Sequence, residues 1–132
     1  MADNAENVNP NMVVRFERAP HTRFYMCRSC KNHLLSLQNQ LFRDQGLNAI
    51  ICQNAVNVSV ENEDSSWTLN HHPVVNVLCN QCNTTQGQKF LRTPLPTRAV
   101  QEGRFLLYLN KMLYWDGNQV VYADTLQPAA ED

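Results

Sequence analysis

The chain has 132 residues and a net charge of −1, with 11 lysine and arginine residues scattered along it. This length predicts one domain with a modest core. The scattered basic residues argue against a nucleic-acid-binding surface, and no apolar run approaches the ~20 residues that cross a bilayer. The polar N-terminus lacks the apolar region of a secretory signal, so we expect no export. We therefore expect neither nucleic acid nor a membrane as a partner, and a nucleic-acid-binding zinc ribbon is the least favoured class of function.

The two ends of the chain differ in composition from its middle. Residues 1–11 are polar and residues 124–132 lack an apolar period, so both predict disordered tails. Residues 12–123 predict the folded domain. Within it, short β-branched and aromatic runs between polar turns predict strands. These runs cover residues 22–27, 49–60 with a break near 53–54, 66–69, 73–78, 88–92, 104–110, 111–115 and 119–122.

The spacing of these runs predicts an all-β fold. Strands that recur about every 8–12 residues are typical of sandwiches or small barrels. The last two runs join across Asp116-Gly117-Asn118, and Asp-Gly is a strong signal for a tight hairpin turn. Leucines at 34, 35, 37 and 41 leave open one short helix over residues 34–43, with Gly46 as its stop.

Two cysteine pairs of the form Cys-x-x-Cys are the strongest chemical signal in the chain. They are Cys27–Cys30 and Cys79–Cys82. Four thiolates suit tetrahedral Zn²⁺ and leave no open coordination position, so the pattern predicts one structural zinc. Such a metal would tie together two distant segments of a small domain, which often needs a staple of this kind.

Other uses of the cysteines fit the sequence less well. A thioredoxin-like dithiol needs one Cys-x-x-Cys at a helix start after a strand, whereas this chain has two pairs and weak helix signals. The chain has five cysteines and no export signal, which favours thiolate–metal chemistry in a reducing compartment over disulfides. The fifth, Cys52, follows Ile50-Ile51 and is interpreted as a core thiol.

Four sequence blocks together resemble the yippee family. The first is Tyr25-Met-Cys27-x-x-Cys30-x-x-His33-Leu34, and the second is the Asn-Ala-Val-Asn-Val-Ser stretch of residues 54–59, where Asn57 matches a characteristic asparagine. The third runs from His72 through the second cysteine pair to Gly87-x-Lys89-Phe90, and the fourth is Glu102-Gly103-Arg104-Phe105. The blocks occur in order over about residues 22–110. The chain departs from the family at Gln88, where tryptophan is expected, at Asn70, where glycine is usual, and in a shorter loop before Gly46.

The resemblance implies a fold and a class of function. The fold is the β-tent, in which two antiparallel sheets meet at one Cys₄ zinc site, as in the thalidomide-binding domain of cereblon. The implied protein is eukaryotic, nuclear or cytoplasmic, and has no enzymatic activity. It would act on other proteins as an interaction or regulatory module. The zinc ligands would be Cys27, Cys30, Cys79 and Cys82.

A ligand-reading function is the alternative that the resemblance leaves open. Relatives of this fold hold small ligands or modified peptides in an aromatic cage, and the matching positions here are Trp67, His72, Gln88 and Phe90. Gln88 would remove one aromatic wall of such a pocket. Trp67 and Phe90 would serve equally well as core residues, because large aromatic rings bury much apolar area. A concave aromatic site would favour the reader, and a filled core would favour the interaction module.

Overall fold

The computed structural model describes residues 13–130, so the predicted tail 1–11 lies outside the described residues. In the described part of the chain, strands form two antiparallel sheets and the helical segments are three short 3-10 turns. The all-β prediction is confirmed. The turns are η2 (Leu37–Asn39), η3 (Glu63–Ser65) and η4 (Leu109–Lys111).

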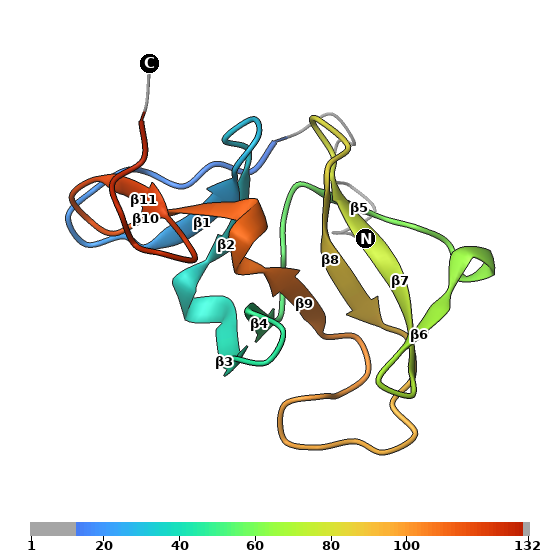
Figure 1. Cartoon of the computed structure of the whole chain (residues 1–132). Helices are drawn as coiled ribbons and strands as arrows, with labels where there is room; N and C mark the ends of the chain where they lie inside the picture. The colour runs from blue at the N-terminus through green and yellow to red at the C-terminus, as the bar shows by residue number, and fades with distance from the viewer. Residues whose placement is uncertain (1–12, 131–132) are drawn as a thin grey trace, which may run out of the picture.

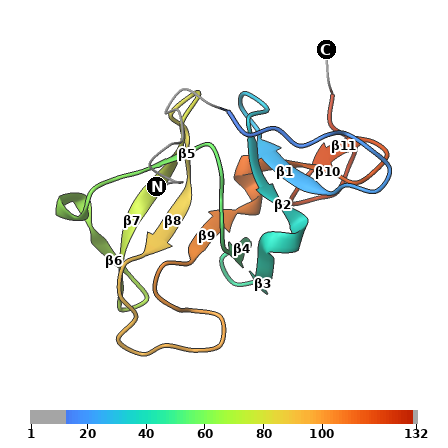
Figure 2. The same ribbon diagram turned by 180° about the vertical axis from the view of Figure 1, so that it is seen from behind.

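The four-stranded sheet combines segments from near both ends of the described chain (Figures 1 and 2). Its strands pair in the order β11-β10-β1-β2, so the last strand in the sequence is one edge. Their bounds are β1 (Phe24–Cys27), β2 (His33–Ser36), β10 (Met112–Trp115) and β11 (Val120–Tyr122). The hairpin predicted across residues 116–118 is present as β10 and β11.

The middle of the chain forms the seven-stranded sheet. Its strands pair in the order β3-β4-β9-β8-β7-β5, and β6 also pairs with β7. The bounds are β3 (Gln40–Asp44), β4 (Ala49–Cys52), β5 (Val58–Val60), β6 (Trp67–Leu69), β7 (His72–Cys79), β8 (Thr85–Phe90) and β9 (Phe105–Tyr108).

The short helix that the leucines left open over residues 34–43 does not form. The segment enters β2, turns through η2 and continues into β3, which belongs to the other sheet. Leu34 and Leu35 are both fully buried in the cluster of side chains that joins the two sheets. Pairing with β1 supplies the backbone hydrogen bonds of β2, so tertiary contacts override the helix propensity of the leucines.

Three apolar clusters make up the core. The largest draws side chains from both sheets and joins them, with Leu35, Ile50, Leu107 and Met112 among its members. A second lies on the seven-stranded sheet around Phe90 and contacts the loop between β8 and β9 through Ala99 and Val100. A third lies on the four-stranded sheet and includes Phe24, Met26, Leu113 and Val120.

The N-terminal segment is held against β2 by Asn57. The Asn57 side chain donates to the carbonyls of His33 and Val14, each at 2.7 Å, and accepts from the Val14 amide at 2.9 Å. Asn57 adopts a φ of 57°, in the left-handed region that asparagine tolerates better than most residues. The asparagine singled out in the sequence therefore fixes one element against another.

The segment after β11 differs from the loose tail predicted for residues 124–132. Tyr122 donates its amide to the Gln127 carbonyl at 2.9 Å, and Ala129 donates to Val120 at 3.0 Å. Pro128 forms an isolated bridge with Val121, and Ala129 packs against the third cluster. The predicted disorder is therefore wrong for residues 124–130, which backbone hydrogen bonds hold against β11. The sequence does not reveal such bonds, because they need no apolar pattern. Residues 131–132 lie outside the described range.

No helix among residues 13–130 has the length and apolar character needed to cross a bilayer.

Candidate metal centre

Each cysteine pair lies in a turn at the end of a strand, and the two turns share one hydrogen-bond pattern. The amide of Lys31 donates to Cys27 at 2.8 Å, and the amide of Asn83 donates to Cys79 at 2.9 Å. Lys31 and Asn83 both have a φ of 63°. The first cysteine of each pair donates its amide to the residue five positions later, Asn32 or Thr84. The chain therefore builds the same metal-binding knuckle twice, once after β1 and once after β7.

The fold brings the four sulfurs of the two knuckles around one point. All four Sγ atoms lie within 4.8 Å of one another. The Cys27–Cys82 sulfurs are 3.6 Å apart and the Cys30–Cys79 sulfurs 3.5 Å apart. A tetrahedron with Zn–S bonds of roughly 2.3 Å has edges of roughly 3.8 Å, which is close to these separations. The cluster thus has the size and the ligand set of a Cys₄ zinc site.

The four ligands differ in their exposure to solvent. Cys27 and Cys79 are buried, Cys30 is half-buried and Cys82 is exposed. Burial raises the pKa of the Cys27 and Cys30 thiols, whereas the Thr84 hydroxyl lowers the pKa of Cys82 to about 6. A bound Zn²⁺ reverses the effect of burial, because a coordinating thiol loses its proton outright. Thiolate charge at Cys27 and Cys30 therefore depends on the metal.

Cys52 and His33 also carry atoms that can bind a metal, but neither belongs to the cluster of four sulfurs. Cys52 is fully buried in the apolar cluster between the sheets, and burial raises its pKa to about 12. His33 accepts the amide proton of Phe16 on Nδ1 at 2.8 Å, and its ring lies against Phe16 and Phe24. Cys52 is a protonated core thiol, and His33 anchors the N-terminal segment.

The residues of the predicted ligand pocket are neighbours on the seven-stranded sheet. Trp67 and Gln88 both donate to the Asn76 side chain, at 3.0 and 3.2 Å, and Tyr108 donates to Gln88 at 2.6 Å. Phe90 is buried in the second apolar cluster. The polar atoms of Trp67 and Gln88 thus form hydrogen bonds within the sheet. The residues make a packed surface with Trp67 at its edge.

His72 completes the predicted set. Its ring meets Phe90 edge-on, with the ring centroids 6.0 Å apart. The residue is buried, and its Nδ1 has no hydrogen-bond partner among the described residues. Its contact with Phe90 places it in the same packed layer.

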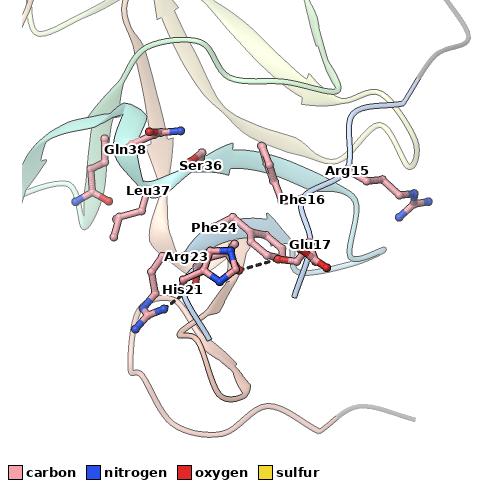
Figure 3. A pocket seen from close by; sticks show the side chains of 11 residues that line it. Arg15, Phe16, Glu17, His21, Arg23, Phe24, Ser36, Leu37 and Gln38 are labelled. Carbon is pink, nitrogen blue, oxygen red and sulfur yellow. Dashed lines mark hydrogen bonds between the residues drawn. The ribbon is translucent and has the colours of Figure 1, made fainter. Parts of the chain in front are cut away.

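A cavity lies away from these residues, between the N-terminal segment and the start of β3 (Figure 3). Its volume is about 780 Å³, within the range of small-ligand sites. Phe16, Phe24 and Leu37 supply apolar walls, and Arg15 and His21 are among the polar residues that line it. No sequence motif indicates this cavity, because its lining comes from two separate segments, residues 15–24 and 36–40, that share no pattern.

Three side chains beside the sulfurs were missed by the sequence reasoning. Asn32 donates to the Cys79 sulfur at 3.3 Å, and Gln86 donates to the Cys27 sulfur at 3.2 Å. The Thr84 hydroxyl lies 3.1 Å from the Cys82 sulfur. Asn32 and Thr84 could have been found from the sequence, because each lies five positions after the first cysteine of its pair. Gln86 has no such signal, since it occupies an irregular position in the pairing of β7 with β8.

Comparisons with known proteins agree with this site and fold. The family described as "Yippee zinc-binding/DNA-binding /Mis18, centromere assembly" matches residues 23–121. A yippee-like protein of Arabidopsis thaliana is 32% identical over 92 residues, covering 67% of this chain and 76% of that protein. Yippee-like 3 of Homo sapiens is 27% identical over 99 residues, covering 72% and 83%.

A solved structure shares the fold. The crystal structure of the Mis18 "Yippee-like" domain superposes with a TM-score of 0.64 at 14% identity, covering 71% of this chain and 95% of that one. Both knuckles fall inside the span matched by the family, and their sulfurs meet at one point. The four cysteines are therefore positioned to bind one zinc ion, and the chain belongs to the Yippee/Mis18 family of zinc-binding proteins.

Proposed function

We propose that the protein is a non-enzymatic interaction or regulatory module whose partners are other proteins. A Cys₄ site leaves no coordination position for a substrate, so its zinc supports the fold. The observation that carries the proposal is the hydrogen-bonded layer of Trp67, Asn76, Gln88 and Tyr108. It includes Trp67 and Gln88, two of the four residues predicted to line a reader's pocket, and it engages their polar atoms within the sheet.

The exposed part of Trp67 supports a protein partner at this face. The residue is 40% exposed although its indole nitrogen is already hydrogen-bonded to Asn76. Tryptophan with a satisfied polar atom and a free ring face is common at the centre of protein interfaces. We therefore place the partner contact on β6. Because exposed thiolate ligands persist where thiols stay reduced, we place the protein in the nucleus or cytoplasm.

Affinity capture followed by mass spectrometry tests the proposal. We expect wild-type protein to retain partners that Trp67→Ala loses and that Leu126→Ala keeps. Leu126 is a suitable control because it is also an exposed large apolar residue, on the segment after β11. Recovery of the same proteins with both variants would place the interface elsewhere. Recovery of no specific protein with the wild type would contradict the interaction module.

The cavity beside the N-terminal segment favours a second function, the reading of a small ligand or modified peptide. Arg15 and His21 offer positive or hydrogen-bonding groups there beside the ring of Phe16. This site differs from the one predicted at Trp67. Titration with short acidic and phosphorylated peptides, monitored by amide NMR, separates the functions. Saturable shifts at residues 15–24 that Arg15→Gln abolishes, and that the exposed control Arg43→Gln retains, would establish the reader.

A separate titration tests the cage predicted at Trp67. In a Trp115→Phe background, Trp67 is the single tryptophan of the chain. Uridine- and glutarimide-like ligands should leave its fluorescence unchanged, because Gln88 lacks a stacking surface and its amide is already hydrogen-bonded. Tight, saturable quenching would overturn the interaction module in favour of the reader.

A further inference from the structure

Two buried carboxamides reach across the metal centre in a reciprocal way. Asn32 follows the first knuckle and donates Nδ2–H to the Cys79 sulfur of the second at 3.3 Å. Gln86 follows the second knuckle and donates Nε2–H to the Cys27 sulfur of the first at 3.2 Å. Asn32 is 2% exposed and Gln86 is fully buried. The two sulfurs that they contact are the two buried ligands.

The orientation of both amides follows the charge on the sulfurs. The side-chain oxygens of Asn32 and Gln86 are buried and have no hydrogen-bond partner among the described residues. A buried carbonyl oxygen is normally paired, so this arrangement needs a compensating interaction. A flipped amide would turn its oxygen toward a thiolate and would be repelled. For Gln86 the unpaired oxygen is therefore the cost of directing the N–H group at sulfur. For Asn32 it is the cost of donating to sulfur and to the oxygens of Asn57 and Asn80.

The charge of the centre explains why such donors are needed. Four thiolates and one Zn²⁺ carry a net charge of −2, and burying uncompensated charge is unfavourable. Hydrogen bonds to a charged group are stronger than those between neutral groups. Cys82 faces solvent and the Thr84 hydroxyl, whereas Cys27 and Cys79 are shielded from water. The buried half of the centre thus depends on the protein for its donors.

We propose that Asn32 and Gln86 are positioning residues for the zinc, which disperse the charge of the two buried thiolates and hold them on the metal. Partners of this kind, outside the ligand set, typically contribute 10–100-fold to metal affinity. Neither residue belongs to the four-cysteine cluster itself.

Gln86→Met gives the sharper test, since methionine preserves the length of the side chain and removes the donor. Its Nε2 has the Cys27 sulfur as its partner, whereas the Asn32 amide is shared with Asn80 and Asn57. The matched control is Gln88→Met, two residues along β8, because Gln88 is also buried and bonds Asn76 and Tyr108 but no sulfur. Transfer of zinc to a chromophoric chelator and the absorption of the Co²⁺-loaded protein are measured for all three proteins.

We expect Gln86→Met to lose about 10–100-fold in zinc affinity. Its sulfur-to-cobalt charge-transfer band should move to longer wavelength, because removing a hydrogen bond raises the energy of the sulfur lone pairs. Gln88→Met should leave both measurements at the wild-type values. Equal zinc affinities and equal band positions in the two variants would overturn the proposal. A purely structural role of Gln86 would not shift the absorption spectrum of the Co²⁺-loaded protein.

A measurement on the wild-type chain covers the case in which Gln86→Met fails to fold. In ¹¹³Cd-loaded protein, scalar coupling across an N–H···S–Cd hydrogen bond connects the amide proton to the metal. We expect such correlations from one side-chain amide proton of Asn32 and one of Gln86. Sharp, assigned amide signals from both residues without coupling to cadmium would overturn the proposal.

Discussion

At the scale of single residues, β8 comes so near to β9 at Gly87 that a side chain has no room there. A Cβ at this position would overlap the backbone carbonyl of Leu106, and Gly87 pairs with Leu107 in the register of the two strands. Neither backbone can move away without breaking the ladder that crosses the seven-stranded sheet. The family block that contains Gly87 therefore reflects a contact between two backbones.

Substitution of Gly87 by alanine should separate these strands. We expect Gly87→Ala to lower the free energy of unfolding of the zinc-loaded protein by about 2–3 kcal/mol, in line with overpacked cores. Gly46→Ala is the control, because its Cβ would meet the Asp44 carboxylate at an ordinary 3.5 Å. Urea denaturation measures both. Equal stabilities would show that the strands can part at little cost.

Substituting the exposed ligand Cys82 distinguishes the contribution of the metal to stability from that of core packing. Cys82 is exposed, so Cys82→Ser takes little from the core but leaves the zinc one thiolate short. We expect loss of zinc and of the folded far-UV circular dichroism spectrum, since structural zinc contributes on the order of 10 kcal/mol in small domains. Cys52→Ala removes a buried core thiol that is not one of the four clustered sulfurs, and it should keep one zinc per chain. A folded Cys82→Ser protein would refute the need for a fourth thiolate.

At the scale of elements, local signals located most strands but could not assign them to sheets. The hairpin of β10 and β11 was predictable because Asp116-Gly117-Asn118 is a local turn, and the two knuckles were predictable because their spacing is local. The short helix left open over residues 34–43 does not form, because pairing of β2 with β1 outweighs leucine propensity. The Asn32 and Gln86 contacts were unpredictable, because each joins segments more than 40 residues apart.

The segment after β11 belongs to the folded unit, so removing it should destabilise the protein. Truncation after Ala123 removes the hydrogen bonds to Tyr122 and Val120 and the 3.6 Å contact between Arg28 and Asp124. We expect a loss of about 1–2 kcal/mol and a melting temperature lower by roughly 4–16 °C. Truncation after Ala130 is the control. Equal melting of the two proteins would mean that residues 124–130 add nothing to stability.

The docking of the N-terminal segment should weaken in acid. Burial lowers the pKa of His33, helped by Arg15 and Arg18, so protonation favours the state in which His33 is free. At pH values above about 6.5, the pKa of a histidine in an unfolded chain, the hydrogen bond between His33 and the Phe16 amide is unaffected. As the pH falls below that value, the bond is progressively lost. Between pH 7 and 5.5 we expect the NMR signal of the Phe16 amide to move toward its free value, while zinc content stays constant.

The His33→Gln variant is the control for this titration. Glutamine retains an acceptor for the Phe16 amide but carries no titrating group in this pH range. Its Phe16 signal should not change with pH. An identical pH profile in the variant would assign the transition to another group.

At the scale of the whole molecule, zinc and one apolar cluster hold two sheets together. One knuckle extends from β1 of the four-stranded sheet, and the other from β7 of the seven-stranded sheet. The cluster that joins the sheets contains Cys27 and Cys79 themselves, so the metal and the core are continuous. Loss of zinc should therefore affect both sheets at once.

Each sheet carries one tryptophan, which allows this coupling to be measured. Trp115 lies on β10 and Trp67 on β6. We expect protein purified without chelator to contain one zinc per chain. We also expect Trp67→Phe and Trp115→Phe proteins to show coincident fluorescence transitions as a chelator removes the metal. Separate transitions would mean that one sheet persists without zinc.

The order of the strands along the chain has a consequence for biosynthesis. All four cysteines precede β9, β10 and β11, whereas β1 needs β10 as a neighbour and β4 needs β9. A growing polypeptide thus has the complete ligand set before either sheet can be completed. Zinc captured at that stage would close the loop between the knuckles in advance, reducing the entropy that later long-range pairings must overcome. Metal supply during translation would then govern how much newly made chain reaches its native form.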